Sequence, residues 1–167
     1  SSEDEHLGLL GLLNSSVACF WLKQVCFPKG GDHVGNEGAR VRKTLWDERY
    51  AFNATNVAEF PLCVGRPLDI ATHLDTQSRQ VTALQPAAVL AAGALPTRTS
   101  LDAARDQAAQ LRRLMIACQE DLDWRCYRLY GLLPAGVGAD EVEFHAPVEV
   151  ALGQRAFEIV LARRVAA

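Results

Sequence analysis

Apolar residues recur every three or four positions along several stretches of the chain, which is the spacing of an amphipathic helix. Residues 7–27 form the first stretch. It ends at Pro28 and is apolar on most sides, so we expect a buried helix. Residues 67–92 form the second stretch, with Gln77 as the one polar exception on its apolar face. Pro86 lies inside this pattern, and we expect the helix to break or kink there.

The third helix has the most regular pattern. A cap at Thr99 or Ser100 predicts where it begins. Its apolar positions alternate steps of three and four, as in a coiled-coil seam, and they are Leu101, Ala104, Ala108, Leu111, Met115, Cys118 and Leu122. Gly131 supplies a natural end. Because a short loop joins this seam to the second helix, we expect a long antiparallel helical hairpin.

Aromatic residues between the first two helices indicate a small β element near residues 46–64. Tyr50 and Phe52 would share one face of a short strand, and we interpret them, with Trp46, as the core of this element rather than as base-stacking residues. A turn would follow at residues 53–56. The predicted fold class is therefore mainly α, a helical bundle with a long antiparallel hairpin and a small β element.

Three parts follow from this pattern. Residues 1–65 hold a helix, a glycine-rich basic loop and short strands, residues 66–133 hold the helical hairpin, and residues 134–167 hold an acidic linker and a C-terminal helix. No initiator methionine precedes the first helix and no capping signal follows the last, so we expect a piece of a longer protein. No apolar run approaches the ~20 residues of a transmembrane helix and no secretory signal is evident, so we expect a cytoplasmic protein without membrane contact.

Composition narrows the chemistry. Hydrophobic residues are 49% and charged residues 22%, as in ordinary soluble globular proteins, and the formal net charge is -3. A free-standing nucleic-acid binder is usually basic, so any DNA contact must come from a local patch or a partner domain. The five cysteines include no C-x-x-C pair and the four histidines have no metal-ligand spacing with them, so we expect reduced thiols and no metal site.

A local basic patch lies in residues 28–45, a loop that combines four glycines with a histidine and four basic residues. Glycines let the backbone approach a phosphate closely, and basic side chains neutralise it. Arg40 or Arg42 can pair with guanine in a bidentate manner, and Asn36 can read adenine. The candidate DNA-binding residues are Lys29, His33, Asn36, Arg40, Arg42 and Lys43. The alternative is a surface loop with incidental charge.

Signatures of catalysis are absent from the sequence. It contains no phosphate-binding G-x-x-x-x-G-K-[ST], no G-x-S-x-G and no H-E-x-x-H motif. An adenine methyltransferase needs an Asn/Asp-Pro-Pro-aromatic loop and a glycine-rich loop for S-adenosylmethionine, and this chain has neither. We therefore expect no catalytic residue and no bound cofactor in it.

Two groups of side chains on the third helix are interpreted as structural rather than as DNA-binding. Trp124, Tyr127 and Tyr130 are three residues apart and would form one stripe, which we interpret as helix packing or a docking face. Four arginines of this helix are interpreted as solvent-exposed or salt-bridged rather than as a clamp on DNA. They are Arg112, Arg113, Arg125 and Arg128.

Three stretches, taken in their order along the chain, resemble a known family. Residues 9–26 contain Leu-Asn-Ser followed by Ala-Cys-Phe-Trp-Leu-Lys-Gln-Val, residues 29–62 include Tyr-Ala-Phe-Asn-Ala-Thr and Glu-Phe-Pro-Leu, and residues 120–132 read Glu-Asp-Leu-Asp-Trp-Arg-Cys-Tyr-Arg-Leu-Tyr-Gly-Leu. Together they resemble the C-terminal region of PglX-type adenine-specific DNA methyltransferases of BREX phage-defence systems. Cys63 departs from the pattern, because the family usually has a second proline there.

The resemblance implies a parent enzyme that transfers a methyl group from S-adenosylmethionine to N6 of adenine in a short DNA sequence, as restriction-modification methyltransferases do. Such enzymes flip the target base out of the duplex. This chain would supply part of the target-recognition region in residues 1–65, plus a helical extension. Its partners would be DNA, the N-terminal methyltransferase domain and other phage-defence proteins. The alternative is a helical interaction or oligomerisation module of the same complex without DNA contact, which the heptad seam and the acidity favour.

Overall fold

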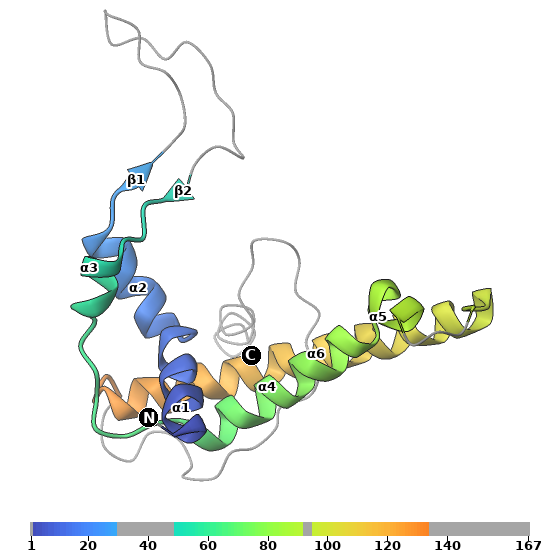
Figure 1. The fold of residues 1–167 in the computed structure, drawn as a ribbon. Coiled ribbons are helices and arrows are strands. Elements are labelled where there is room, and N and C mark those ends of the chain that lie inside the picture. Colours follow the sequence, from blue (N-terminus) through green and yellow to red (C-terminus); the bar gives the residue numbers. More distant parts are fainter. Residues whose placement is uncertain (1, 30–48, 92–94, 134–167) are drawn as a thin grey trace, which may run out of the picture. The chain divides into compact units, whose positions relative to one another are not determined.

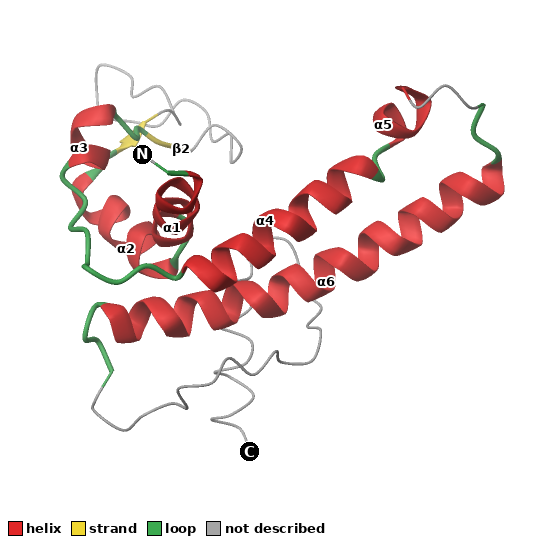
Figure 2. Ribbon diagram, turned by 60° about the horizontal axis from the view of Figure 1, so that its bottom comes forward, coloured by secondary structure: helices red, strands yellow, loops and turns green. Residues whose placement is uncertain are grey.

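The protein is mainly α-helical, as the sequence predicts (Figures 1 and 2). The computed structural model describes residues 2–29, 49–91 and 95–133. The chain divides into two compact units, Ser1–Ser15 with Cys63–Ala167, and Ser16–Leu62. None of the described helices is both long enough and apolar enough to cross a membrane.

The described residues of the first unit form four helices. They are α1 (Glu3–Leu13), α4 (Leu68–Ala83), α5 (Pro86–Ala91) and α6 (Arg98–Leu129). Figure 2 shows α4 and α6 side by side, with α5 on the path from one to the other, and α1 lies against the first half of α4. The residues predicted as a hairpin thus lie in one unit.

A capping box starts α1 earlier than the apolar pattern indicates. Ser2 Oγ accepts a hydrogen bond from the Glu5 amide (3.3 Å), and a Glu5 carboxylate oxygen accepts one from the Ser2 amide (2.9 Å). The three residues of the first turn, Glu3, Asp4 and Glu5, are acidic and therefore favour the positive end of the helix dipole.

The single helix predicted for residues 7–27 is wrong, because the chain leaves the helix at Asn14 and Ser15. Ser15 Oγ donates a hydrogen bond to the carbonyl of Leu12 (2.6 Å), and such local bonds compete with the helical ladder. The expected burial of this segment holds only in part. Leu12 is fully buried, whereas Phe20 exposes 67% of its surface.

The second predicted helix, residues 67–92, is also two helices. Leu84 and Gln85 separate α4 from α5, and Pro86 is the first residue of α5, so the break expected at this proline is confirmed. Proline has no amide hydrogen and suits the first turn of a helix. Gln77 is buried on α4, and its Oε1 has no hydrogen-bond partner among the described residues.

The long helix α6 spans 32 residues and begins slightly before the predicted cap. Its N-cap is Thr97, whose Oγ1 accepts a hydrogen bond from the Ser100 amide (3.1 Å). The predictions of Thr99 or Ser100 as the cap are therefore wrong by two or three residues. Both residues lie inside the first turn of the helix.

Gly131 ends α6 as predicted, with a positive φ of 67°. Its amide donates to the carbonyl of Arg128 (2.9 Å), and the amide of Leu132 donates to the carbonyl of Tyr127 (2.8 Å). This pair of bonds is a Schellman motif, which satisfies carbonyls that the helix would otherwise leave unpaired.

Burial in the first unit is concentrated near α1. The buried residues of α4 and α6 are Ile70, Ala71, Gln77, Ala108, Ala117, Cys118, Glu120, Asp121, Leu122, Asp123 and Cys126. We call residues 78–114 the arm. Among its described residues only Ala108 is buried. The unit therefore has a thinly packed arm and a well-packed remainder. We call this remainder, α1 with the parts of α4 and α6 outside the arm, the base.

Glycine lets α1 approach α4 closely. A Cβ added to Gly11 would lie 2.9 Å from Ala71 Cβ and 3.0 Å from Pro67 Cγ, with Leu122 Cδ1 at 3.6 Å. One turn earlier, a Cβ on Gly8 would lie 3.0 Å from Arg66 Cβ. Any side chain at Gly11 would push α1 away from Pro67 and Ala71.

Ala71 and Pro67 belong to the start of α4, so Gly11→Ala is expected to destabilise the first unit. In an open helix the same change stabilises by about 1 kcal/mol, but overpacking costs roughly 1–3 kcal/mol. Urea denaturation measures the free energy of unfolding. Adding Ala71→Gly to Gly11→Ala should restore part of the lost stability. The double variant should therefore be more stable than the sum of the two single effects predicts. Additive single effects, or a stabilised Gly11→Ala variant, would contradict the close contact.

The second unit contains α2 (Ser16–Val25), β1 (Pro28–Lys29), β2 (Arg49–Tyr50) and α3 (Ala54–Ala58). The β element predicted for residues 46–64 is not confirmed in that form. Of the described residues in that range, 49–64, only Arg49–Tyr50 is strand, and its partner β1 lies before residue 30. The turn predicted at residues 53–56 is instead the start of α3, because Asn53 Oδ1 accepts from the Asn56 amide (2.8 Å) and caps the helix.

Candidate nucleic-acid interface

A short antiparallel ladder joins the two ends of residues 29–49, which we call the basic segment. β1 pairs with β2 so that Pro28 lies opposite Tyr50 and Lys29 lies opposite Arg49. Paired Cα atoms of such a ladder are about 5 Å apart. Lys29 and Arg49, which flank the 19 residues 30–48, therefore lie next to each other.

Contacts within the second unit hold this ladder. The Ala51 amide donates to the Phe27 carbonyl (3.0 Å) and extends the pairing by one residue. Asn56 Nδ2 donates to the Val25 carbonyl (3.0 Å) and lies 3.4 Å from Cys26 Sγ, which ties α3 to the end of α2. The ladder is thus anchored on both strands.

An edge-to-face ring contact adds to these hydrogen bonds. The rings of Trp21 and Phe60 lie 5.6 Å apart at 70°. Aromatic pairs of this kind contribute about 0.5–1.5 kcal/mol beyond the area they bury. The contact joins α2 to the residue that follows α3 closely in the chain, and Phe60 is buried.

Aromatic side chains beside the ladder are exposed. Tyr50 and Phe52 stack on each other, with ring centroids 6.0 Å apart and ring planes at 10°. Phe52 exposes 58% of its surface, Tyr50 36% and Phe27 61%. The interpretation of Tyr50 and Phe52 as core residues is therefore wrong, because two-residue strands form no sheet that could cover them. Trp46 lies outside the described residues.

The predicted DNA-binding residues fall mostly outside the described part of the chain. Lys29 is in β1, opposite Arg49 in the ladder. The structure describes none of the others, which are His33, Asn36, Arg40, Arg42 and Lys43. The structure therefore brings together the ends of the basic segment, and these site assignments stay predictions.

Charge in this region is distributed unevenly. Residues 30–48 contain Arg40, Arg42 and Lys43 against four acidic residues, a net charge of -1. The excess of positive charge appears only when the flanking Lys29 and Arg49 are included. Cations are thus grouped at the ladder and at residues 40–43.

Side chains of α6 follow the interpretations made from the sequence where they are described. Arg125 Nη2 lies 3.5 Å from Asp69 Oδ2, so this arginine is salt-bridged. Arg112 and Arg113 are exposed. The rings of Trp124 and Tyr127 meet edge to face at 5.6 Å, as expected for packing along one helix.

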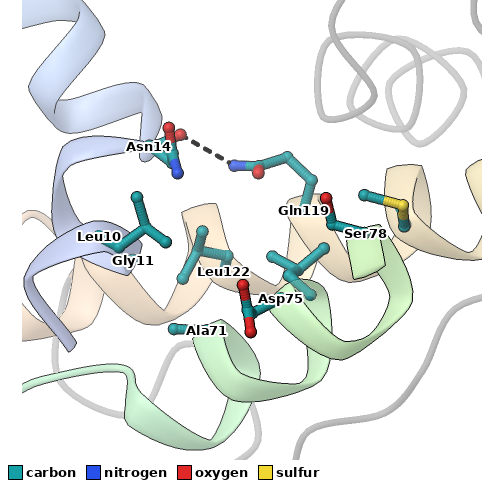
Figure 3. A pocket seen from close by; sticks show the side chains of 10 residues that line it. Leu10, Gly11, Asn14, Ala71, Asp75, Ser78, Gln119 and Leu122 are labelled. Atoms are coloured by element: carbon teal, nitrogen blue, oxygen red, sulfur yellow. Dashed lines mark hydrogen bonds between the residues drawn. The ribbon is translucent and has the colours of Figure 1, made fainter. Parts of the chain in front are cut away.

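A pocket of about 190 Å³ lies in the first unit, between α1, α4 and α6 (Figure 3). At one edge, Gln119 Nε2 donates to the Asn14 carbonyl (3.1 Å). Leu122 and Ala71 point toward it from α6 and α4. Among the described residues that line it, Asp75 is the only carboxylate and pairs with Arg79 at 2.7 Å, so these residues offer no pair of groups for acid–base chemistry.

Two cysteines of α6 are held as neutral thiols. Burial, together with Asp121 and Asp69, raises the pKa of Cys118 to about 12. Burial also raises the pKa of Cys126 to about 12, against the opposing effect of a hydrogen bond with Ser15. A thiolate is the reactive form of cysteine, so neither thiol is a nucleophile near neutral pH. The described residues hold no His, Cys, Asp and Glu cluster suited to a metal ion.

Alkylation should separate the cysteines by environment. Near pH 8, iodoacetamide should label Cys63 and Cys19, which are half-buried, and leave Cys118 and Cys126 unmodified, as peptide mass spectrometry would detect. Folding raises the pKa of both thiols, so their protonated forms contribute to the free energy of unfolding. This contribution is complete below pH ~9 and is lost as pH rises toward about 12. Unfolded protein, labelled at all five cysteines, is the control. Equal labelling of Cys118 and Cys63 in the folded protein would contradict the burial.

Comparisons with known proteins identify relatives of the chain. The chain is 52% identical, over its whole length, to "Adenine-specific methyltransferase PglX" of Streptomyces coelicolor. It spans 14% of the length of that relative. A family model described as "Domain of unknown function (DUF7008)" matches residues 115–167, beginning inside α6. No solved structure matches the chain.

Proposed function

Because this chain is homologous along its whole length to the C-terminal region of PglX-type adenine-specific methyltransferases, we propose that it is part of a site-specific N6-adenine DNA methyltransferase and contributes to DNA target recognition. The 52% identity to PglX carries the proposal. The chain's own residues lack the motifs of methyl transfer. S-adenosylmethionine and the catalytic residues would therefore belong to an N-terminal methyltransferase domain of the complete enzyme.

The ladder of the second unit supports a recognition role. It holds the two ends of the segment that contains most of the predicted DNA-binding residues next to each other, and binding residues are often displayed between such anchored ends. The register places Lys29 opposite Arg49 in this ladder. We propose that Lys29, His33, Asn36, Arg40, Arg42 and Lys43 contact DNA.

Exposed aromatic rings beside the ladder fit the same role. Tyr50 and Phe52 form a flat stacked surface next to the basic segment. Enzymes that act on a base take it out of the duplex, which leaves unstacked bases nearby. Stacking of a base on an aromatic side chain contributes roughly 1–3 kcal/mol. This surface would thus bind bases at a distorted site better than an intact duplex.

Removing the predicted base contacts should weaken target binding. In the complete enzyme, Arg40→Ala and Arg42→Ala together are expected to reduce affinity for the target duplex by at least about fivefold, since one bidentate arginine–guanine pair contributes about 1–3 kcal/mol. Fluorescence anisotropy at fixed salt measures the effect. Arg125→Ala is the matched control, because Arg125 pairs with Asp69 in the first unit. Equal affinity of the double variant and the wild type would remove the proposal.

A second role, in protein contact, is favoured by the arm. Leu90 and Leu95 expose 57% and 95% of their surfaces, and Leu114 exposes 37%. We propose that the end of the arm that holds Leu90 and Leu95 packs against the methyltransferase domain of the same enzyme, with other phage-defence proteins or a second copy as the alternatives.

Polar substitution at the end of the arm tests this second role. In the complete enzyme, Leu90→Ser with Leu95→Ser should lower the melting temperature by several degrees, because a buried leucine contributes about 1.5–3 kcal/mol. Val64→Ser is the control, since Val64 is fully exposed and lies outside the arm. Differential scanning fluorimetry that gives equal melting temperatures for wild type and double variant would contradict the contact.

A further inference from the structure

The arm carries a positive charge that the rest of the chain does not share. Its residues 78–114 include five arginines, two aspartates and no lysine or glutamate, a net charge of +3. The whole chain has a net charge of -3, so the remainder has -6. The arginines are Arg79, Arg98, Arg105, Arg112 and Arg113.

Three of these arginines form a line along α6. Arg98, Arg105 and Arg112 are seven residues apart, so they lie on one side of the helix with successive Cα atoms about 10.5 Å apart. The side chains of Arg98 and Arg105 are 96% and 74% exposed, and Arg112 is exposed as well. We call these three residues the arginine stripe.

The stripe is separate from the residues that pack the two helices together. Ala108 and Leu111 belong to the apolar seam of α6 and are buried and half-buried. Figures 1 and 2 show this half of α6 beyond α1, with α4 and α5 as the described elements beside it. The arginine side chains therefore remain accessible to a partner.

Two carboxylates counter the stripe only weakly. Asp102 lies 3.7 Å from Arg98 Nε and 3.4 Å from Arg105 Nη2, and Asp106 lies 3.6 Å from Arg105 Nε. Exposed ion pairs of this kind contribute about 0–1 kcal/mol, so an arginine can exchange its aspartate for a stronger anion. No ion pair of Arg112 is found among the described residues.

We propose that the arginine stripe binds the phosphate backbone of duplex DNA. This inference rests on the proposed function, in which the complete enzyme binds DNA through the second unit. Guanidinium groups pair with phosphates in bidentate geometry, and a row of them on a rigid helix suits a polyanion with regularly spaced charges. Because phosphates carry no sequence information, the stripe adds affinity and orientation and leaves the target sequence unchanged.

The salt dependence of DNA binding tests the stripe. In the complete enzyme, Arg98→Gln, Arg105→Gln and Arg112→Gln together should make the slope of log K against log salt shallower by about 2 to 3, since each phosphate neutralised contributes about 0.9. Affinity should fall equally for target and non-target duplexes. Glutamine has nearly the helix propensity of arginine, and circular dichroism checks that the fold is retained. The reciprocal variant, Asp102→Asn with Asp106→Asn, should tighten binding to both duplexes.

Each other outcome has a definite meaning. If the wild type binds no duplex, the proposed function and this inference both fail. If it binds duplexes without sequence preference but the triple variant has the shallower slope, the recognition role fails and the stripe inference stands. If the wild type binds its target but the triple variant keeps its slope, the stripe inference alone is overturned. A change of preferred sequence in the triple variant would also overturn it. So would an unchanged slope together with an altered mass in light scattering, which would assign the stripe to protein contact.

Discussion

The first unit depends on the close approach of α1 to the start of α4 at Gly11. A Cβ there would come within 3.0 Å of Pro67 and closer still to Ala71, so the absence of a side chain sets the distance between the helices. Around this contact Leu12 and Leu122 are fully buried. The base of the unit is thus organised by one small residue. Protein interiors are close-packed, which is why a single added carbon would be felt there.

Separate parts of the chain carry the two kinds of surface described above. In the second unit, the ladder closes a glycine-rich basic segment and leaves aromatic rings exposed beside it. In the first unit, the arm combines apolar residues at its end with arginines along α6. The described residues of the two surfaces thus differ in chemistry, with stacked aromatic rings beside the ladder and exposed leucines and arginines on the arm.

Local signals in the sequence predict local features of the fold. Pro86 and Gly131 act through their own backbone restrictions, so the break before α5 and the end of α6 are predictable from one residue each. The break at Ser15 depends on a side-chain hydrogen bond that competes with the helix, and apolar spacing does not register it. The pairing of β1 with β2 joins residues on either side of a 19-residue segment, and no local pattern encodes that. The exposure of Phe52 follows from this missing sheet.

The candidate sites divide in the same way. Composition indicates the basic segment, whereas the sequence alone favours an ordinary solvated face for the arginines of α6. The seven-residue spacing of Arg98, Arg105 and Arg112 was available in the sequence, but their exposure beside a thinly packed arm required the structure. The uneven burial along α6 also has a dynamic consequence. Local opening costs least where few apolar contacts are lost, so amide protons near Arg98 should exchange with solvent far sooner than those near Leu122, within one continuous helix. The stability of α6 is therefore graded along its length, and the burial of Leu122 and its neighbours holds one end of the helix more firmly than the other.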